Sequence, residues 1–354
     1  MSKKIAVAVS GCTGMVGQQF LRMLWRHPRF AVRALIASPR SEGCRYTEVS
    51  DWRVSASMPP ELARMRIEPL HPSVLRERGI GVMFSALPAG VAAGAESRMR
   101  EAGVAVFSNA AAHRSSEDIP ILLPEVNPEH LHLARAQKRR FGGFIITNSN
   151  CCVSGLALSL KPLLEFGIQR VDVVTFQAVS GGGRRGVASM DILDNVIPFI
   201  PAEEEKIENE LKKIFGRLVR DTVEPWPGRV FASCCRVPVR EGHLECVTVS
   251  TRNPVEESEI IDAWSSFSAP SRSERLPSAP RRPIVLFREP NRPQPGLDAH
   301  LGGPARTRGM AVGVGRIRAT GERIRYFMLV NNTIRGAAGT SILNAELAAA
   351  NGLI

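Results

Sequence analysis

The sequence predicts an α/β protein with two parts. The first is an N-terminal Rossmann-type, doubly wound parallel sheet, and the second is an α+β part with a mixed sheet. Three observations lead to this prediction. The 354 residues exceed what one ordinary hydrophobic core encloses. Short apolar strands alternate with helical stretches at the start of the chain, whereas longer β-branched strands dominate after residue 170.

Composition excludes several classes of function. Apolar residues make up 44% of the chain, and the seven cysteines form an odd set without metal-type spacing, so we expect free thiols, no metal and a cytoplasmic protein. No apolar run reaches membrane-spanning length, and the residues before the first strand are too few for a signal sequence. The net charge of +12 permits a nucleic-acid partner. However, aromatics are only 6% and basic residues are scattered, which favours anionic small substrates and no nucleic acid.

The first motif follows a buried strand at residues 5–9. Glycines at Gly11, Gly14 and Gly17 lead into a helix expected from Met15 to about Arg26. Glycines at this kind of spacing between a strand and a helix allow a tight turn and close approach of the backbone to a pyrophosphate. A dinucleotide site is therefore predicted, with a purely structural turn as the alternative.

The next strand, residues 31–37, indicates which dinucleotide binds. An NAD site places an acidic residue about twenty positions beyond the last glycine, where it binds the ribose 2′-hydroxyl. The chain instead has Ser38, Pro39, Arg40 and Ser41 there. A guanidinium beside two hydroxyls suits a 2′-phosphate, so we expect NADP. The alternative is that Arg40 is an ordinary solvated loop charge.

Strand and helix then alternate as expected for a doubly wound sheet. Strands are predicted at residues 82–86 and 104–107, with a helix at 91–102 between them. The stretches Ser85-Ala86-Leu87-Pro88 and Ser108-Asn109-Ala110 follow these strands, at the carboxyl edge where ligands bind. The same residues could also be simple turn formers.

A cysteine lies where a reactive thiolate would be stabilised. A strand at residues 144–147 runs into Asn150, Cys151 and Cys152, and an apolar helical pattern follows. Unpaired amides and the positive dipole end of the helix favour an ionised sulfur and can hold an oxyanion. The alternative is a buried structural cysteine, the commonest state of a free thiol.

The second half is predicted to form a mixed, largely antiparallel sheet with helices on one face. Residues 269–308 are rich in Pro and Arg and are expected to form an extended loop at the surface or at a subunit interface, and an apolar helix is expected after Gly336. The remaining predicted elements are strands at 171–179, 230–239, 244–251, 310–317 and 324–330, and helices at 190–200 and 203–215.

Taken together, these stretches resemble the aspartate-β-semialdehyde dehydrogenase family, in its archaeal and fungal branch. The resemblance extends over essentially the whole chain. It is carried by the stretches Gly11–Gly17, Ser85–Pro88, Pro124–Pro128, Asn148–Cys151, Gln177–Gly181, Leu193–Pro198, Glu203–Lys206, Arg236–Val239, Gly242–His243 and Asn332–Gly339. The order and spacing of these motifs are specific, whereas each motif alone is not.

The resemblance implies a role for each matched residue. Cys151 is the implied nucleophile, because Cys152 stands where the family usually has Ser or Thr, and His243 is the implied general acid and base. Gln177 and Asn150 complete the implied catalytic set. Arg236 would bind the substrate carboxylate, Glu203 its ammonium and Lys206 its phosphate, with Ser108 and Asn109 nearby. The implied cofactor residues are Gly11, Thr13, Gly14, Met15, Val16, Gly17, Ser38, Arg40, Ser41, Ser85, Leu87, Pro88, Ser180, Gly181 and Asn332.

When the residues are considered without the resemblance, several of these roles have a purely structural alternative. His243 could be a surface-turn histidine, and Arg236 could form a structural salt bridge. Glu203 could simply be one of three acids at a solvated helix start.

The resemblance implies NADP-dependent reductive dephosphorylation of β-aspartyl phosphate to aspartate semialdehyde through a thioester on Cys151. This step belongs to the biosynthesis of lysine, threonine and methionine. The alternatives are malonyl-CoA reduction on the same fold and, from a different class, a non-catalytic basic binding protein. Residues 1–150 and 331–354 would bind NADP, and residues 151–330 would form the catalytic and dimerisation part. We expect a homodimer, with a tetramer as the alternative.

Overall fold

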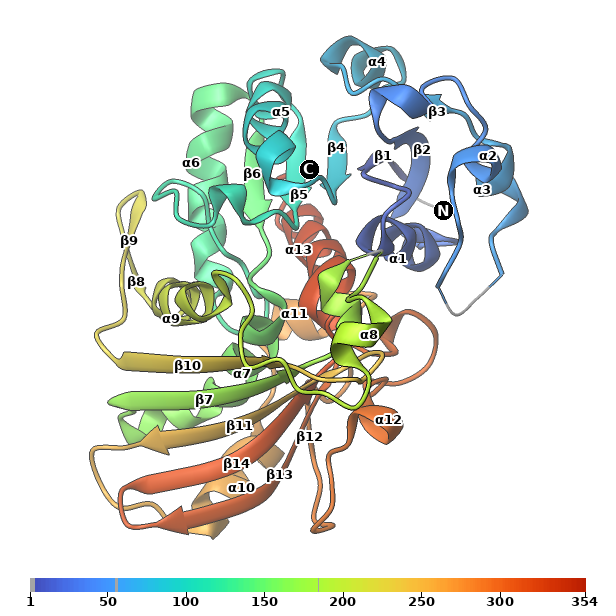
Figure 1. The fold of residues 1–354 in the computed structure, drawn as a ribbon. Coiled ribbons are helices and arrows are strands. Elements are labelled where there is room, and N and C mark those ends of the chain that lie inside the picture. Colours follow the sequence, from blue (N-terminus) through green and yellow to red (C-terminus); the bar gives the residue numbers. More distant parts are fainter. Residues whose placement is uncertain (1–3, 55–56, 184) are drawn as a thin grey trace.

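The computed structural model describes residues 4–54, 57–183 and 185–354, and its first half is a parallel sheet (Figure 1). The sheet has six strands in the order β3-β2-β1-β4-β5-β6, and every neighbouring pair is parallel. This order is that of the dinucleotide-binding fold, so the predicted fold class of this half is confirmed. The strands are β1 (Ile5–Ser10), β2 (Phe30–Ile36), β3 (Ile67–Glu68), β4 (Val82–Ser85), β5 (Ala105–Ser108) and β6 (Phe144–Thr147).

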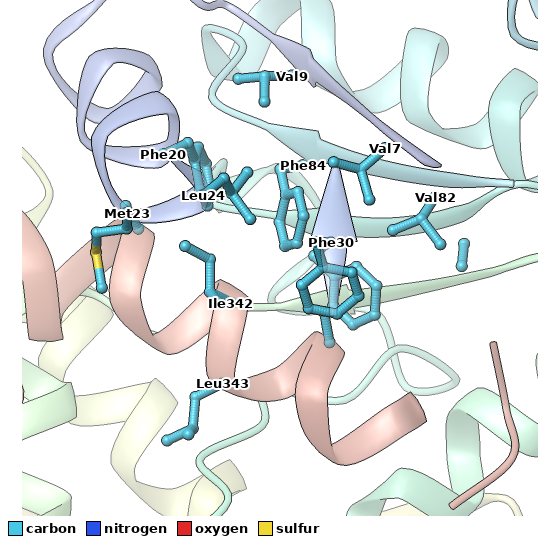
Figure 2. Packing of buried hydrophobic residues seen from close by; sticks show 14 of the residues in the cluster. Val7, Val9, Phe20, Met23, Leu24, Phe30, Val82, Phe84, Ile342 and Leu343 are labelled. Carbon is cyan, nitrogen blue, oxygen red and sulfur yellow. The ribbon is translucent and has the colours of Figure 1, made fainter. Parts of the chain in front are cut away.

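Helices cover both faces of this sheet because its strands are apolar on both sides. They are α1 (Met15–Leu24), α2 (Tyr46–Val49), α3 (Pro60–Arg64), α4 (Pro72–Glu77), α5 (Ala89–Glu101), α6 (Leu131–Phe141) and the C-terminal α13 (Gly339–Ala350). Figure 2 shows how Ile342 of α13 lies among Phe20, Phe30 and Phe84 of the first half. The last helix of the chain therefore belongs to the core of the first sheet.

The glycine turn after β1 is sterically required. Gly11 has a φ of +70°, and a Cβ there would lie 2.4 Å from the carbonyl oxygen of Ala86. A Cβ on Gly17 would lie 2.2 Å from the carbonyl oxygen of Gly11. The glycines thus let β1, its turn and α1 approach the end of β4, where the strand order of the sheet reverses.

The second sheet is mixed, as the sequence predicts. Its order is β10-β7-β11-β14-β13-β12; the three central pairings are antiparallel and the two outer ones are parallel. Its strands are β7 (Arg170–Gln177), β10 (Arg229–Arg236), β11 (His243–Ser250), β12 (Ile284–Leu286), β13 (Val312–Thr320) and β14 (Arg323–Val330).

Helices cover one face of the mixed sheet. α7 (Cys151–Leu160) packs on β14, α10 (Glu257–Ser266) on β12 and β13, and α9 (Glu203–Ile214) beside β10. The uncovered face carries exposed apolar side chains, among them Val174 and Phe231. The minor elements of this half are α8 (Ser189–Ile192), α11 (Ser271–Glu274), α12 (Pro295–Asp298) and the hairpin β8 (Arg217–Val219) and β9 (Thr222–Glu224).

The helix predicted at residues 190–200 is wrong. Only α8, ending at Ile192, is helical, because Asp194 adopts a φ of +56° and Pro198 follows. Ile197 instead exchanges backbone hydrogen bonds with Arg236, so the segment is joined to the end of β10 by an isolated bridge.

The extended loop predicted for residues 269–308 is also partly wrong. The segment supplies the edge strand β12, which pairs with β13, and the short helices α11 and α12. Three residues of β12 are too few to give a periodic signal between prolines. None of the helices in the described parts of the chain combines the length and apolar character needed to cross a membrane.

Candidate active site

Three strand ends bring the predicted catalytic side chains together. Gln177 ends β7 and Arg236 ends β10, and the parallel register pairs these two residues. His243 begins the antiparallel β11, one position beyond the pair formed by Leu244 and Phe176. Since alternate strand residues share a face, all three side chains lie on the buried face of the sheet, and each is at most 7% exposed.

Cys151 is the first residue of α7, and this helix start places it beside the row formed by Gln177, Arg236 and His243. Asn150 is its N-cap, and the side-chain oxygen of Asn150 accepts a hydrogen bond from the Cys152 amide at 2.8 Å. Cys151 is half-buried, whereas Cys152 is fully buried in the core of the second half. A Cβ on Gly336 would lie 2.8 Å from the Cβ of Cys151, so the C-terminal motif packs directly against the nucleophile.

Cys151 and His243 form a close pair. The Sγ of Cys151 lies 3.2 Å from the Nε2 of His243. The other ring nitrogen, Nδ1, accepts a hydrogen bond from the backbone amide of Ala178 at 3.0 Å. A neutral imidazole that accepts at Nδ1 carries its proton on Nε2, so His243 points an N–H at the sulfur.

Electrostatics favour the ionised sulfur. A hydrogen bond from the Cys152 thiol, followed by the interactions with His243 and Arg114, lowers the pKa of Cys151 well below its ordinary value, although burial raises it. Burial, and then the neighbouring Cys151, raise the pKa of Cys152 well above its ordinary value. These opposite shifts favour ionisation of Cys151 over ionisation of Cys152.

The same geometry opposes a metal centre. The ligand atoms of Cys151, Cys152 and His243 lie within 4.8 Å of one another. A histidine ligand needs a lone pair on the nitrogen that faces the metal and donates from the other nitrogen to an oxygen. In His243 the roles are reversed, because Nδ1 faces an N–H group. The arrangement suits a thiolate and an imidazole N–H.

Glu203 belongs to the site and is not a solvated cap. It is 8% exposed, and its Oε1 accepts hydrogen bonds from Asn150 at 2.7 Å and from Gln177 at 3.3 Å. Its Oε2 lies 3.5 Å from the Nζ of Lys206, one turn along α9. The structure thus brings four predicted site residues into one network, with a buried carboxylate at its centre.

Two further residues next to this network, Glu210 and Arg114, were not predicted from the sequence. Glu210 is buried and accepts hydrogen bonds from the backbone amide of Asn150 and from Arg114, the latter at 2.8 Å. Burial raises the pKa of Glu210, an effect that Arg114 partly offsets. Glu210 lies two helical turns after Glu203, so the helical period could have revealed it. A cavity of about 920 Å³ opens beside Arg114, Lys206 and Glu210.

Arg236 and the turn that contains Gly181 lie on the other side of the pair formed by Cys151 and His243. The Nη1 of Arg236 donates to the carbonyl oxygen of Ala178 at 2.8 Å, so the contact is with backbone and not with a structural acid. A Cβ on Gly181 would lie 2.6 Å from this Nη1 and 3.3 Å from the Cε1 of His243. A side chain at position 181 would therefore displace the Arg236 guanidinium and press on the His243 ring.

Asn332 links the two turns that flank the cysteine and histidine. Its Nδ2 donates to the hydroxyl of Ser180 at 2.8 Å, and its Oδ1 accepts from the amide of Gly242 at 3.0 Å. The predicted cofactor residues Ser180, Gly181 and Asn332 thus lie together, next to His243.

The other predicted cofactor residues line the carboxyl edge of the first sheet. Gly11, Thr13, Gly14, Met15 and Val16 are partly exposed around the start of α1, while Gly17 is buried against the turn. Across the reversal point of the sheet, Ser85 ends β4, and Leu87 and Pro88 follow it. At the end of β2, Arg40 is exposed, and the hydroxyls of Ser38 and Ser41 lie 3.3 Å apart.

The side chains of Ser108 and Asn109 make their contacts outside the cluster around Cys151. Ser108 is fully buried, and its hydroxyl donates to Glu96 at 2.8 Å within the first half. Asn109 donates to Ser341 at 3.1 Å and accepts from Asn148 at 2.8 Å. The Ser108 side chain is therefore tied to α5, and of the two side chains only that of Asn109 contacts the loop before α7, through Asn148.

A doubly wound parallel sheet joined to a helix-borne thiolate beside a histidine defines the class of thiol-dependent, nucleotide-binding oxidoreductases. Residues 6–134 match the family described as "Semialdehyde dehydrogenase, NAD binding domain", and residues 160–335 match "Semialdehyde dehydrogenase, dimerisation domain". The chain belongs to the aspartate-semialdehyde dehydrogenase family, as its motifs predict. It therefore carries both a nucleotide-binding and a dimerisation domain.

Individual relatives agree with this assignment. Aspartate-semialdehyde dehydrogenase of Archaeoglobus fulgidus is 45% identical over 97% of this chain and 98% of its own. The crystal structure of aspartate semialdehyde dehydrogenase with NADP from Candida albicans aligns with a TM-score of 0.90 at 35% identity, over 99% of this chain and 100% of the other. Malonyl CoA reductase (NADP) of Metallosphaera sedula is more distant, at 33% identity over 100% of this chain and 99% of its own.

Proposed function

We propose that the protein reduces β-aspartyl phosphate to aspartate semialdehyde with NADPH, through a thioester on Cys151. One observation carries the proposal: the sulfur of Cys151 lies 3.2 Å from the Nε2 of His243, in a chain that is 45% identical to an aspartate-semialdehyde dehydrogenase over 97% of its length. An ionised cysteine at a helix start is a competent nucleophile for an acyl phosphate.

The nucleotide fits the first half of the molecule. The glycines of the first turn leave no room for a Cβ at Gly11, as a pyrophosphate cradle requires. Arg40, with Ser38 and Ser41, would bind the 2′-phosphate, and Ser180, Gly181 and Asn332 would lie at the nicotinamide end. When bound, the reduced cofactor supplies a hydride for the thioester carbon.

The residues around Cys151 account for the other steps. The thiolate attacks the acyl carbon, the bond to phosphate breaks, and a thioester forms. The Nε2–H of His243 stabilises the oxyanion that develops on the carbonyl oxygen. After reduction, the carbon–sulfur bond breaks and regenerates the thiolate. One proton from solvent ends on the released phosphate, so the reaction balances.

Substrate recognition rests on opposite charges at the two walls of the site. Arg236 would bind the α-carboxylate, and Lys206 would bind the phosphate. Glu203, already held by Asn150 and Gln177, would receive the α-ammonium. Malonyl-CoA has no ammonium and would leave this carboxylate with only its partners within the protein, Asn150, Gln177 and Lys206. The buried position of Glu203 therefore supports the amino-acid substrate.

An assay in the reverse direction tests the proposal. Purified protein should form NADPH from NADP and aspartate semialdehyde only when phosphate is present, and Glu203→Gln should raise KM or lower turnover. Malonyl-CoA with NADPH serves as the competing substrate. The proposal fails if malonyl-CoA is reduced more efficiently than aspartate semialdehyde is processed, or if Glu203→Gln changes neither parameter.

We also propose a division of labour between the halves. Residues 1–150 and 331–354 bind the nucleotide, since α13 packs into the core of the first sheet, and residues 151–330 perform catalysis and dimerisation. The uncovered sheet face, with Val174 and Phe231 exposed, would bind a second copy of the chain. A dimer is preferred and a tetramer is the alternative. The free cysteines suit a cytoplasmic location.

A further inference from the structure

Three consecutive residues after β14 form a group of side-chain hydrogen bonds next to the active site. They are Asn331, Asn332 and Thr333, and each is at most 4% exposed. Asn332 accepts from the amide of Gly242 and donates to the hydroxyl of Ser180. The proposed reaction gives no role to the side chains of Asn331 and Thr333.

A directed chain of hydrogen bonds runs through Thr333 from α1 to the turn before β11. The Nε of Arg22 donates to the Oε1 of Gln19 at 2.8 Å, which fixes the orientation of this amide. The Nε2 of Gln19 donates to the hydroxyl of Thr333 at 3.1 Å. That hydroxyl donates in turn to the Oε1 of Glu241 at 2.6 Å. Each donor in the chain therefore has its own acceptor.

The hydroxyl proton of Thr333 is directed at Glu241 and not at its other neighbour. The alternative acceptor, the Oδ1 of Asn331, lies farther away, at 3.3 Å. This oxygen already accepts from the backbone amides of Thr333 at 3.1 Å and of Ile334 at 2.9 Å. A carboxylate is also the stronger acceptor. The chain thus ends on the carboxylate of Glu241.

A second contact holds the other carboxylate oxygen of Glu241. The Nδ2 of Asn331 donates to the carbonyl oxygen of Ala299 at 2.9 Å and faces the Nδ1 of His300 at 3.4 Å. Since Nδ1 accepts there, the ring proton lies on Nε2, which is 3.5 Å from the Oε2 of Glu241. Burial lowers the pKa of His300, which favours this neutral ring. Thr333 and His300 therefore hold the carboxylate from two sides.

The turn that carries Glu241 leads directly into His243. Between them lies Gly242, which has a φ of +95° and whose amide donates to Asn332 at 3.0 Å. The turn is thus fixed at two successive residues immediately before β11 begins. His243, its next residue, has its Nε2 3.2 Å from the sulfur of Cys151.

We propose that Glu241 and Thr333 are positioning residues that hold this turn and so keep the imidazole of His243 aligned with Cys151. Through Gln19 the same bonds tie the turn to α1, the helix that follows the first glycine turn. The inference rests on the proposed function, in which His243 stabilises the oxyanion. Both residues act through His243 and not on the sulfur directly.

Alkylation of Cys151 measures this alignment in the absence of substrate and cofactor. The full-length protein is treated with iodoacetamide at a series of pH values, and mass spectrometry locates the modified cysteine. His243→Ala removes the donor to the sulfur and should raise the midpoint of the profile by about 1–2 pH units. Thr333→Val removes the hydroxyl but keeps the shape of the side chain. This variant and Glu241→Ala should each raise the midpoint by about 0.5 pH unit.

Conservative variants and a double variant separate positioning from general damage to the structure. Thr333→Ser keeps the donor and Glu241→Gln keeps an acceptor, so both should stay close to the wild-type midpoint. In the His243→Ala background, Thr333→Val should cause no further rise, because its effect passes through the imidazole. Thr251→Val is the matched control. It removes a buried hydroxyl that donates to a backbone carbonyl oxygen at 2.8 Å, just beyond the far end of β11, and should leave the midpoint unchanged.

The proposal is overturned if neither Thr333→Val nor Glu241→Ala moves the midpoint, or if Thr333→Val adds its full shift when His243 is absent. An equal shift in Thr251→Val would also overturn it. Thermal unfolding shows whether each variant keeps the fold, and the comparison of Thr333→Val with Thr333→Ser decides if His243→Ala does not fold. Because the readout needs neither cofactor nor substrate, its result is independent of whether aspartate semialdehyde is the substrate.

Discussion

Cys151 and Cys152 are adjacent in the sequence, but their pKa values are shifted in opposite directions because their side chains have different surroundings. Cys151 is half-buried and faces His243, whereas Cys152 faces the core of the second half. The hydrogen bond from Cys152 lowers the pKa of Cys151, and burial raises that of Cys152. As the pH falls through the lowered pKa of Cys151, the thiolate and its reactivity are lost.

Cys151→Ser should therefore abolish nearly all turnover while the fold and NADP binding persist, since a serine hydroxyl stays protonated at this position. Cys152→Ser should stay active. Turnover with aspartate semialdehyde and phosphate, together with nucleotide binding by fluorescence, measures both effects. An active Cys151→Ser protein with an inactive Cys152→Ser protein would reverse the assignment of the nucleophile.

Arg40→Ala should weaken NADPH binding about ten- to a hundredfold and leave NADH binding nearly unchanged. The expected loss is about 1.5–3 kcal/mol for a hydrogen bond to a charged group, made only with the 2′-phosphate. Titration of both cofactors against the wild type and the variant measures it. Arg33→Ala, at an exposed arginine on β2, is the matched control. Equal losses for both cofactors would refute the role of Arg40.

Among the elements, α7 decides the geometry of the site. Asn150 caps its first turn and also donates to Glu203 on α9, so one side chain fixes both the start of α7 and the position of the Glu203 carboxylate. The apolar remainder of α7 is buried against the mixed sheet and holds this start in place.

Asn150→Ala should lower the free energy of unfolding by about 1–2 kcal/mol, because the Cys152 amide loses its capping acceptor and Glu203 loses a donor. Denaturation in urea measures the change. Asn209→Ala, at an exposed position on α9, should stay within about 0.5 kcal/mol of the wild type. Equal stability of Asn150→Ala and wild type would show that the cap contributes nothing.

On the scale of the whole molecule, the C-terminal segment connects the two halves. It leaves β14 of the mixed sheet, passes Cys151 at Gly336 and enters the first core as α13. A π-helical turn, Ile334–Ala338, precedes α13. Its Arg335 forms two hydrogen bonds with the carboxylate of Glu125, at 2.7 and 3.0 Å, and both side chains are 0% exposed. Nearer the end, Glu346 bonds His27 at 2.7 Å.

Glu125→Ala should destabilise the protein by about 3–5 kcal/mol, because it leaves the buried guanidinium of Arg335 without its charged partner. The same urea experiment measures this loss. Glu224→Ala breaks the exposed pair with Arg217 and should change stability by less than about 1 kcal/mol. Similar values for the two variants would contradict the assigned importance of the buried pair.

The sequence by itself determined the elements whose signals are local. The period of apolar residues predicts β1, α1, β2 and five of the six strands of the mixed sheet, and the glycines at positions 11 to 17 predict the first turn. The cysteine at a helix start, the absence of an acid after β2 and the order of the motifs are also readable from the chain alone. These features led to the fold class and the family.

Only the tertiary structure decided which side chains share a site. Gln177, Arg236 and His243 are brought together by strand register, which depends on pairings between distant segments. Pairing with distant segments also joins Ile197 to Arg236, where a helix was predicted, and makes part of a proline-rich stretch the strand β12. The roles of Glu210 and Arg114 depend on burial and on partners far away in the sequence. Periodicity reports which face of an element is apolar, whereas the energy of a charged group depends on what that face meets in three dimensions.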